Sequence, residues 1–238
     1  MRMKHPNFVE LEVRGDYALF TDPITKVGGE KCTYQIPTYE ALKGILASVY
    51  WKPTFLWYVD DVRVMNQIQM ETRGIRPVKW QGGNDLSYYT YLKDVKYQVR
   101  AHFEWNPNRP EFEKDRNENK HHNMAKRMVE KGGRRDIFLG TRECQGYVRP
   151  CVFGEGQGAY DEVEEISFGL MYHGITYPDE AYSPETRGRL TTNLWNPVMR
   201  KGVVHFSRPE DCPMHRPLHE AKMKEFDANK NALSEEAP

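Results

Sequence analysis

The sequence has few cysteines, and they form no motif. Its 238 residues include four, Cys32, Cys144, Cys151 and Cys212, with no C-x-x-C pair among them. Cysteines this scattered exclude a disulfide framework and a four-cysteine zinc site. They are typical of a reducing compartment, and we expect a cytoplasmic protein.

The sequence also lacks long hydrophobic runs and an excess of charge of either sign. No stretch approaches the roughly 18 apolar residues of a membrane helix, so we expect neither membrane insertion nor secretion. Lys plus Arg and Asp plus Glu both number 34, and the formal net charge is zero. A surface for a polyanion would therefore have to come from local charge.

Several well-known catalytic motifs are missing or incomplete. No G-x-S-x-G elbow is present, and the glycine-spaced stretch 154–158 lacks the Lys and Ser/Thr of a phosphate-binding loop, so we expect a turn there. Cys212, His215 and His219 have a spacing that a metal could use, but they are only three and two prolines interrupt them. A metal-dependent hydrolase is thus a minor alternative, and we expect no metal and no cofactor.

Periodicity and turn residues predict an α+β protein. The expected elements are a strand over 9–13, a helix over 38–53 with Thr38 as N-cap, a strand over 55–64, a loop or hairpin over 72–87, a strand over 95–105, a polar helix over 117–131 and a strand over 134–148. This order is that of the split βαβ motif. We therefore expect a ferredoxin-like (RRM-like) domain with one antiparallel sheet over residues 1–150, a small antiparallel β-sheet domain over 151–221 and a polar tail over 222–238.

Charge is distributed unevenly along the chain. Residues 114–135 carry eight Lys and Arg against three Asp and Glu, a local +5, whereas residues 155–165 carry five acidic residues and no cation. This asymmetry would steer a polyanion to one face; a merely solvated helix surface is the alternative. The basic residues that we expect to contact RNA are Lys52, Arg116, Lys126, Arg127, Lys131, Arg134 and Arg135.

The polar helix also carries groups suited to RNA cleavage without a metal. Lys120, Arg127 and Lys131 fall on one stripe of its surface, and His121 falls on the next. Such cleavage needs a base for the ribose 2′-hydroxyl, a cation for the phosphorane and an acid for the leaving 5′-oxygen. Histidine, with a pKa of about 6.5, transfers protons near neutrality. A surface histidine with no function is the alternative.

Aromatic residues are frequent near the end of the first predicted helix. The segment 50–53 reads Tyr-Trp-Lys-Pro, and Tyr50 points away from the apolar stripe of that helix. Aromatic rings beside basic residues suit stacking on unpaired bases, whereas most such rings simply pack in a core. We therefore regard Tyr50 as a candidate site residue.

Four segments together resemble a known family. Residues 15–23 (GDYALFTDP), 42–53 (LKGILASVYWKP), 119–121 (NKH) and 138–143 (FLGTRE) are similar, in order and spacing, to the CRISPR-associated RAMP-superfamily protein of the Dvulg (type I-C) subtype. The match spans most of the chain. It implies the ferredoxin-like domain and the small β-sheet domain that the predicted elements also indicate.

The resemblance implies a metal-independent endoribonuclease. Members of the family cut the CRISPR repeat RNA at the base of its hairpin and stay bound to the 5′ handle of the crRNA, beside the backbone and large subunits of a type I-C interference complex. The family's catalytic residues correspond to Tyr50, Lys120 and His121, and the choice of His121 over His122 rests on the resemblance. Either Tyr50 or His121 would be the base; a tyrosine base would need a nearby cation, for which Lys120 is our candidate. A subunit that binds the handle without cutting is the main alternative.

Overall fold

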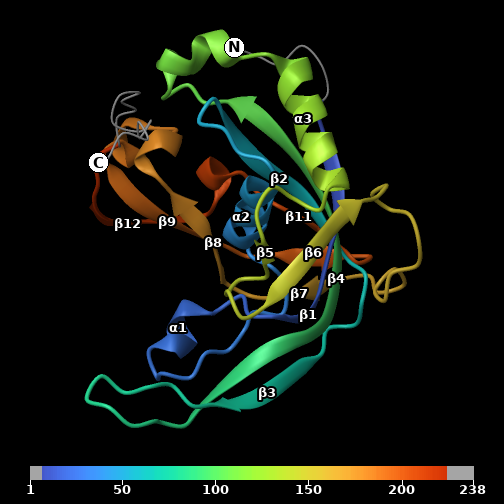
Figure 1. The fold of residues 1–238 in the computed structure, drawn as a ribbon, viewed down its shortest axis with the longest axis vertical. Coiled ribbons are helices and arrows are strands. Elements are labelled where there is room, and N and C mark those ends of the chain that lie inside the picture. The colour runs from blue at the N-terminus through green and yellow to red at the C-terminus, as the bar shows by residue number, and fades with distance from the viewer. Residues whose placement is uncertain (1–6, 224–238) are drawn as a thin grey trace, which may run out of the picture.

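The fold is α+β, as predicted, with mainly antiparallel sheets and few helices (Figure 1). It was obtained as a computed structural model, which describes residues 7–223. The strands are β1 (Val9–Ala18), β2 (Phe55–Val64), β3 (Met70–Ile75), β4 (Ser87–Trp105), β5 (Ile137–Phe138), β6 (Gln145–Pro150), β7 (Ile166–Ser167), β8 (Met171–Thr176), β9 (Arg189–Trp195), β10 (Val198–Arg200), β11 (Val203–His205) and β12 (Met214–Glu220). The α-helices are α1 (Pro23–Lys26), α2 (Tyr39–Val49) and α3 (Glu118–Glu130), and a 3₁₀ turn, η1 (Pro110–Asp115), precedes α3.

Both predicted long helices are present and begin with a side-chain cap. Thr38 accepts a hydrogen bond from the Ala41 amide at the start of α2, as predicted, and Asn117 accepts one from the Lys120 amide at the start of α3. Helix α2 ends at Val49 rather than at residue 53, because the next residue, Tyr50, has extended backbone angles.

The centre of the main sheet has the strand order β6-β1-β4-β2, and all these pairs are antiparallel. Leu11 of β1 lies opposite Val99 of β4 and Pro150 of β6. Because side chains alternate along a strand, Leu11 and Val99 face the core with α2 and α3, whereas Glu12 and Lys96 point to the other side. We call that other side the polar face.

Two predicted segments differ in detail from the structure. Within the expected loop or hairpin over 72–87, β3 pairs with the first part of β4, so the strand predicted over 95–105 begins at Ser87. The predicted strand over 134–148 is two short strands, β5 and β6. Gly74 interrupts the alternation of β3, and Gly140 lies between β5 and β6. In β4 the irregular residue is Asp94, which has a positive φ of 49°.

The C-terminal part of the chain contributes to two sheets. Strands β8, β9 and β12 form a separate antiparallel sheet, whereas β7, β10 and β11 extend the main sheet because β11 pairs with β2. Of the strands after residue 150, only β8, β9 and β12 therefore form the small sheet that we expected there. The division of the chain at residues 150 and 221 stays a prediction, and most of the predicted tail lies outside the described residues.

One hydrophobic core joins the sheet to both helices. It includes Leu11, Leu46, Phe103 and Val129, and it extends to Trp195 in β9. The core therefore fixes α2 and α3 side by side on one face of the main sheet, and their adjacent ends carry the site.

Across residues 7–223 no helix has the length and apolar character needed to span a bilayer.

Candidate active site

The structure brings Tyr50 and His121 together at the ends of the two helices. Tyr50 follows the last residue of α2, and His121 lies in the first turn of α3. The Tyr50 hydroxyl oxygen is 2.8 Å from Nδ1 of His121, across 71 residues of sequence. Both side chains are enclosed, since His121 is 0% exposed and Tyr50 is 3% exposed. The aromatic rings of Phe55, Phe103 and Trp105 surround the imidazole.

The second nitrogen of His121 determines which way the hydrogen bond to Tyr50 runs. Nε2 lies 2.7 Å from the backbone carbonyl oxygen of Asp115. A carbonyl only accepts, so Nε2 carries the proton and donates it. In the neutral imidazole Nδ1 is therefore free to accept, and the Tyr50 hydroxyl donates to it.

The Asp115 carboxylate lies beside this pair and binds two further groups. Its Oδ1 pairs with Nζ of Lys120, and its Oδ2 accepts a hydrogen bond from the Thr54 hydroxyl at 2.8 Å. Oδ2 is also 3.4 Å from Nε2 of His121. The Lys120 side chain is 52% exposed, so its ammonium group lies at the surface above the enclosed pair.

Burial sets the protonation state of the pair. It lowers the pKa of His121 below the ordinary value, although the hydrogen bond to Asp115 and the charge of that residue act in the opposite direction. Burial also raises the pKa of Tyr50, assisted by the negative charge of Asp115 and opposed by the charge of Arg134. Near neutral pH His121 is therefore neutral and Tyr50 is protonated.

The expectation that Lys120 would make Tyr50 a base is not supported. Lys120 is paired with Asp115, and the pKa of Tyr50 moves upward rather than downward. His121 carries the free lone pair, so it is the better acceptor for a proton, with the Tyr50 hydroxyl as the donor next to it.

His122 is held apart from this pair. Its Nε2 lies 2.9 Å from the backbone carbonyl oxygen of Phe8, to which it donates. The two neighbouring histidines therefore face different parts of the molecule, and His121 is the one that contacts Tyr50.

Most of the predicted RNA-binding residues are exposed, on or next to α3 and, for Lys52, just after Tyr50. They are Lys52, Lys126, Arg127, Lys131, Arg134 and Arg135. Arg127 contacts the sulfur atom of Met124, and for the other five no ion pair occurs within residues 7–223. Arg116 differs, because its Nη2 donates to the carbonyl oxygens of Asn106 and Arg109. It holds the segment before α3 in place, so its guanidinium is already engaged by the protein.

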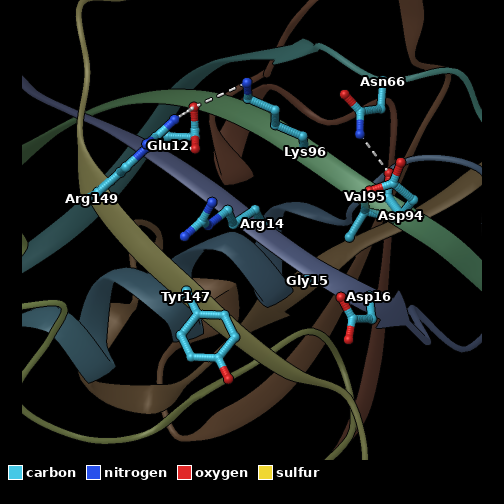
Figure 2. A pocket seen from close by; sticks show the side chains of 10 residues that line it. All are labelled: Glu12, Arg14, Gly15, Asp16, Asn66, Asp94, Val95, Lys96, Tyr147 and Arg149. Carbon is cyan, nitrogen blue, oxygen red and sulfur yellow. Dashed lines mark hydrogen bonds and ion pairs between the residues drawn. The ribbon is translucent and has the colours of Figure 1, made fainter.

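The polar face of the sheet has a different electrostatic character. A hollow on this face is lined by residues that include Arg14 and Tyr147. Nζ of Lys96 is 3.4 Å from Oε2 of Glu12, and Nε of Arg149 is 2.7 Å from its Oε1. Figure 2 shows both basic side chains directed at Glu12. Glu12 thus partly neutralises the charges of Lys96 and Arg149, and its carboxylate repels a phosphate.

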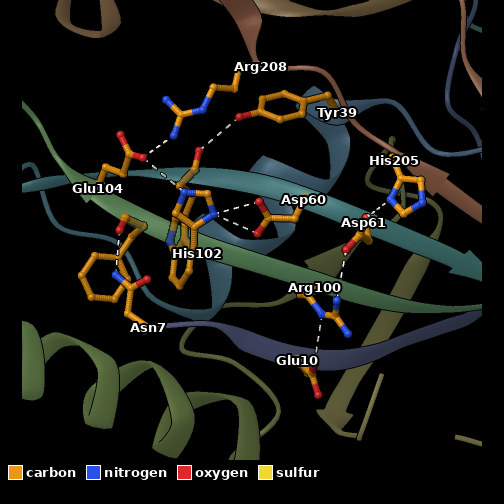
Figure 3. Close-up of polar contacts among 12 residues, drawn as sticks. Asn7, Glu10, Tyr39, Asp60, Asp61, Arg100, His102, Glu104, His205 and Arg208 are labelled. Carbon is orange, nitrogen blue, oxygen red and sulfur yellow. Dashed lines mark hydrogen bonds and ion pairs between the residues drawn. The ribbon is translucent and has the colours of Figure 1, made fainter. Parts of the chain in front are cut away.

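The neighbouring part of the polar face shows the same mutual pairing. In Figure 3 Arg100 bridges Glu10 and Asp61, and Asp61 also binds His205. A second chain runs from Asp60 through His102 and Glu104 to Arg208. These networks neutralise their own charges, whereas Lys126, Lys131, Arg134 and Arg135 make no ion pair within residues 7–223. The surface around α3 is therefore the better one for phosphates.

The alternative metal ligands do not converge. The Cys212 thiol is buried and donates to the backbone carbonyl of Arg208, and His215 binds Asn193. Throughout the described part of the chain, no three His, Cys, Asp or Glu side chains are grouped as metal ligands. The stretch 154–158 is, as predicted, part of a connection between strands; Arg63 binds the carbonyl oxygens within it.

Sequence reasoning missed Asp115 and Thr54. Asp115 was one of three acidic residues in a basic segment, and Thr54 had no predicted role. Their contact spans 61 residues, so no local pattern marks it. The one available signal is that Asp115 lies five residues before Lys120, close enough to meet it across a helix N-terminus.

Comparison with known families gives one match over most of the chain. Residues 8–207 match the family model of Cas5d, described as a CRISPR-associated protein of the Cas5 type. A protein of Mannheimia succiniciproducens named "CRISPR pre-crRNA endoribonuclease Cas5d" is 31% identical over an alignment of 149 residues, and the match covers 53% of this chain and 64% of that protein. A protein of Thermus thermophilus with the same name is 28% identical over 188 residues, 74% and 77% of the two chains. The match thus spans slightly under two thirds of the first relative.

Two solved structures share the fold. One, titled as the crystal structure of a CRISPR-associated protein, superposes with a TM-score of 0.76 at 35% identity and covers 91% of this chain and 100% of that one. The other is a functionally uncharacterized protein of Streptococcus mutans, with a TM-score of 0.73 at 38% identity, covering 88% and 96% of the two chains.

Proposed function

This chain belongs to the Cas5d family of CRISPR-associated proteins, and on that premise we propose that it is an endoribonuclease that processes CRISPR precursor RNA. It cuts the repeat at the base of its hairpin, by attack of a 2′-hydroxyl and without a metal ion. The cut leaves a 2′,3′-cyclic phosphate, and the protein stays on the 5′ handle as a subunit of a type I-C interference complex. The four strands β6-β1-β4-β2 with α2 and α3 form its ferredoxin-like core.

The observation that carries the proposal is the 2.8 Å contact between Tyr50 and His121 with Lys120 beside it. Three residue types suited to this reaction, drawn from two segments far apart in the sequence, occur at one point of the fold. The same point is flanked by exposed cations that a folded RNA stem would contact through its phosphates.

The chemistry follows from the protonation states. The 2′-oxygen attacks the adjacent phosphorus as its proton passes to His121. The bond from phosphorus to the 5′-oxygen breaks, and this oxygen leaves as a hydroxyl by taking a proton back from the His121 imidazolium. Because His121 is enclosed, a proton moving between RNA and His121 passes through the Tyr50 hydroxyl, which gives its proton to Nδ1 as it takes one from the RNA. Lys120 stabilises the negative charge that develops on the phosphate.

The enclosure of the pair favours a second candidate function. With His121 0% exposed and Tyr50 3% exposed, cutting requires that bound RNA reach the Tyr50 hydroxyl. A subunit that binds the 5′ handle through the cations around α3 without cutting has no such requirement.

The deciding experiment incubates the purified protein, in EDTA, with the repeat RNA of its own CRISPR locus and with a copy that has one 2′-deoxy sugar at the cut site. We expect one cut in the first RNA and none in the second. Tight binding of both RNAs without a cut would establish the handle-binding function instead. Cutting only when a divalent metal is restored would contradict the proposed mechanism.

A further inference from the structure

The residue that joins all parts of the candidate site is Asp115. Its backbone carbonyl accepts from Nε2 of His121 at 2.7 Å, and its carboxylate binds Lys120 and Thr54. Thr54 lies on the connection that carries Tyr50 into β2, and Lys120 and His121 lie in the first turn of α3. Asp115 thus contacts both segments that the reaction has to bring together.

The carbonyl of Asp115 fixes the tautomer of His121. With the proton on Nε2, the lone pair of Nδ1 is directed at the Tyr50 hydroxyl. The Tyr50 hydroxyl, the His121 imidazole and Asp115 therefore follow one another in a row. In such a row the third residue orients the imidazole, and the imidazole takes the proton from the hydroxyl.

The carboxylate has a second effect once His121 takes a proton. Its Oδ2 is 3.4 Å from Nε2, so the imidazolium forms next to a negative charge in an otherwise aromatic enclosure. An opposite charge at this distance favours the charged form of the imidazole. Without it, the enclosure would disfavour proton uptake still more strongly.

The same carboxylate limits where the Lys120 ammonium can go. Half of the Lys120 side chain is exposed, and a free lysine there would sample many rotamers. Its ion pair with Asp115 keeps the ammonium close to the Tyr50–His121 pair, where a phosphate would have to bind for the cut.

We propose that Asp115 is the positioning residue of this site: it orients His121 toward Tyr50, stabilises the imidazolium and retains Lys120 at the surface above them. This inference rests on the proposed ribonuclease function. Asp115 acts through His121 and Lys120 and needs no contact with the RNA.

The test compares wild type, Asp115→Asn and Glu113→Gln in single-turnover cleavage of the repeat RNA from pH 5 to 8. Asparagine keeps the backbone carbonyl, the size and an acceptor for Thr54, but it removes the charge. We expect a rate loss of about 10- to 100-fold and a shift of the acidic limb to lower pH by about one unit. Glu113 is an exposed acid in the same 3₁₀ turn, and its variant should match wild type.

The outcomes separate the two proposals. If wild type does not cut, the proposed function fails. If wild type cuts and Asp115→Asn has the same rate and pH profile, the function stands and the role of Asp115 is overturned. Should Asp115→Asn fold poorly, Thr54→Val removes only the hydroxyl that holds the carboxylate and should lower the rate at unchanged RNA affinity; an unchanged rate would overturn the proposal.

Discussion

The Tyr50 hydroxyl donates a hydrogen bond to Nδ1 of His121 inside an enclosure of aromatic rings, and the opposite nitrogen of the same imidazole donates to a backbone carbonyl. The imidazole is therefore held at both ends. Its position depends on the junction of α2 with β2 and on the start of α3, which the core fixes together.

Replacement of Tyr50 by Phe should abolish most cleavage while leaving the fold intact. The ring would still pack in the enclosure, but His121 would lose its proton donor. We expect single-turnover cleavage to fall by about 100-fold or more, with the affinity for repeat RNA unchanged. Tyr147→Phe is the matched control, because Tyr147 is an exposed tyrosine on the polar face. Equal losses in the two variants would argue against a role for the Tyr50 hydroxyl.

Replacement of Lys120 by Ala should reduce the cleavage rate at saturating protein. The variant removes the cation next to the reacting phosphate, and a loss of about 100-fold is expected for such a group. Lys79→Ala, in the exposed loop between β3 and β4, removes a lysine of similar exposure that is paired with Asp85, and its rate should equal that of wild type. A Lys120→Ala rate within twofold of wild type would contradict the assignment.

The exposed cations of α3 should govern how RNA binding depends on salt. Removing one cation that binds a phosphate should reduce the slope of log affinity against log salt by about one. We expect Lys126→Ala and Lys131→Ala each to weaken binding of the repeat hairpin and to lower that slope, as filter binding at several salt concentrations would show. Affinity that does not change with salt would exclude a phosphate-binding role for this surface.

The pH dependence of cleavage should reflect the low pKa of His121. The neutral imidazole accepts the proton, and burial keeps it neutral below the pH of about 6.5 at which an ordinary histidine titrates. Cleavage should therefore be maintained as the pH falls through 6.5 and should decline only below it. A rate that halves near pH 6.5 or above would mean that His121 is not the acceptor or that its pKa is not lowered. A rate–pH profile of wild type in single turnover decides this.

A different histidine, His173, should make the fold less stable in acid. Its ring stacks on the ring of Tyr39 with 4.3 Å between the centroids, and its Nε2 lies 2.9 Å from the backbone carbonyl oxygen of Ser207. Burial lowers the pKa of His173 to about 4. The unfolded chain binds this proton first as the pH falls below about 6.5, so the free energy of unfolding should drop by about 2 kcal/mol between pH 7 and pH 5 on account of this residue. Urea unfolding of wild type and His173→Gln at both pH values measures the difference; an equal drop in the two proteins would contradict the prediction.

The parts of the fold that the sequence predicted are those with local causes. Helix α2 begins where Thr38 can cap it, and its apolar residues repeat at helical spacing. The pairing of β11 with β2 has no such signal, because a strand of three residues is too short to show an alternation and its partner is about 140 residues away.

The candidate site likewise contains residues that local patterns indicated and residues that they did not. A histidine and a lysine on a basic helix pointed to α3, and Tyr50 was a candidate to which the resemblance gave a catalytic role. The structure places its hydroxyl against His121. Neither composition nor spacing could indicate Asp115 as a shared partner, because its contacts are set by how the 3₁₀ turn before α3 packs against Thr54.

The pairing of β11 with β2 also affects how the chain is made. Strand β2 is complete when residue 64 has been synthesised, but its partner at residues 203–205 leaves the ribosome much later. Throughout that interval one edge of the sheet has unpaired backbone groups that another nascent chain could join. The main sheet can thus be completed only after residue 205 has been synthesised, because its β2 edge waits for a segment about 140 residues further along the chain.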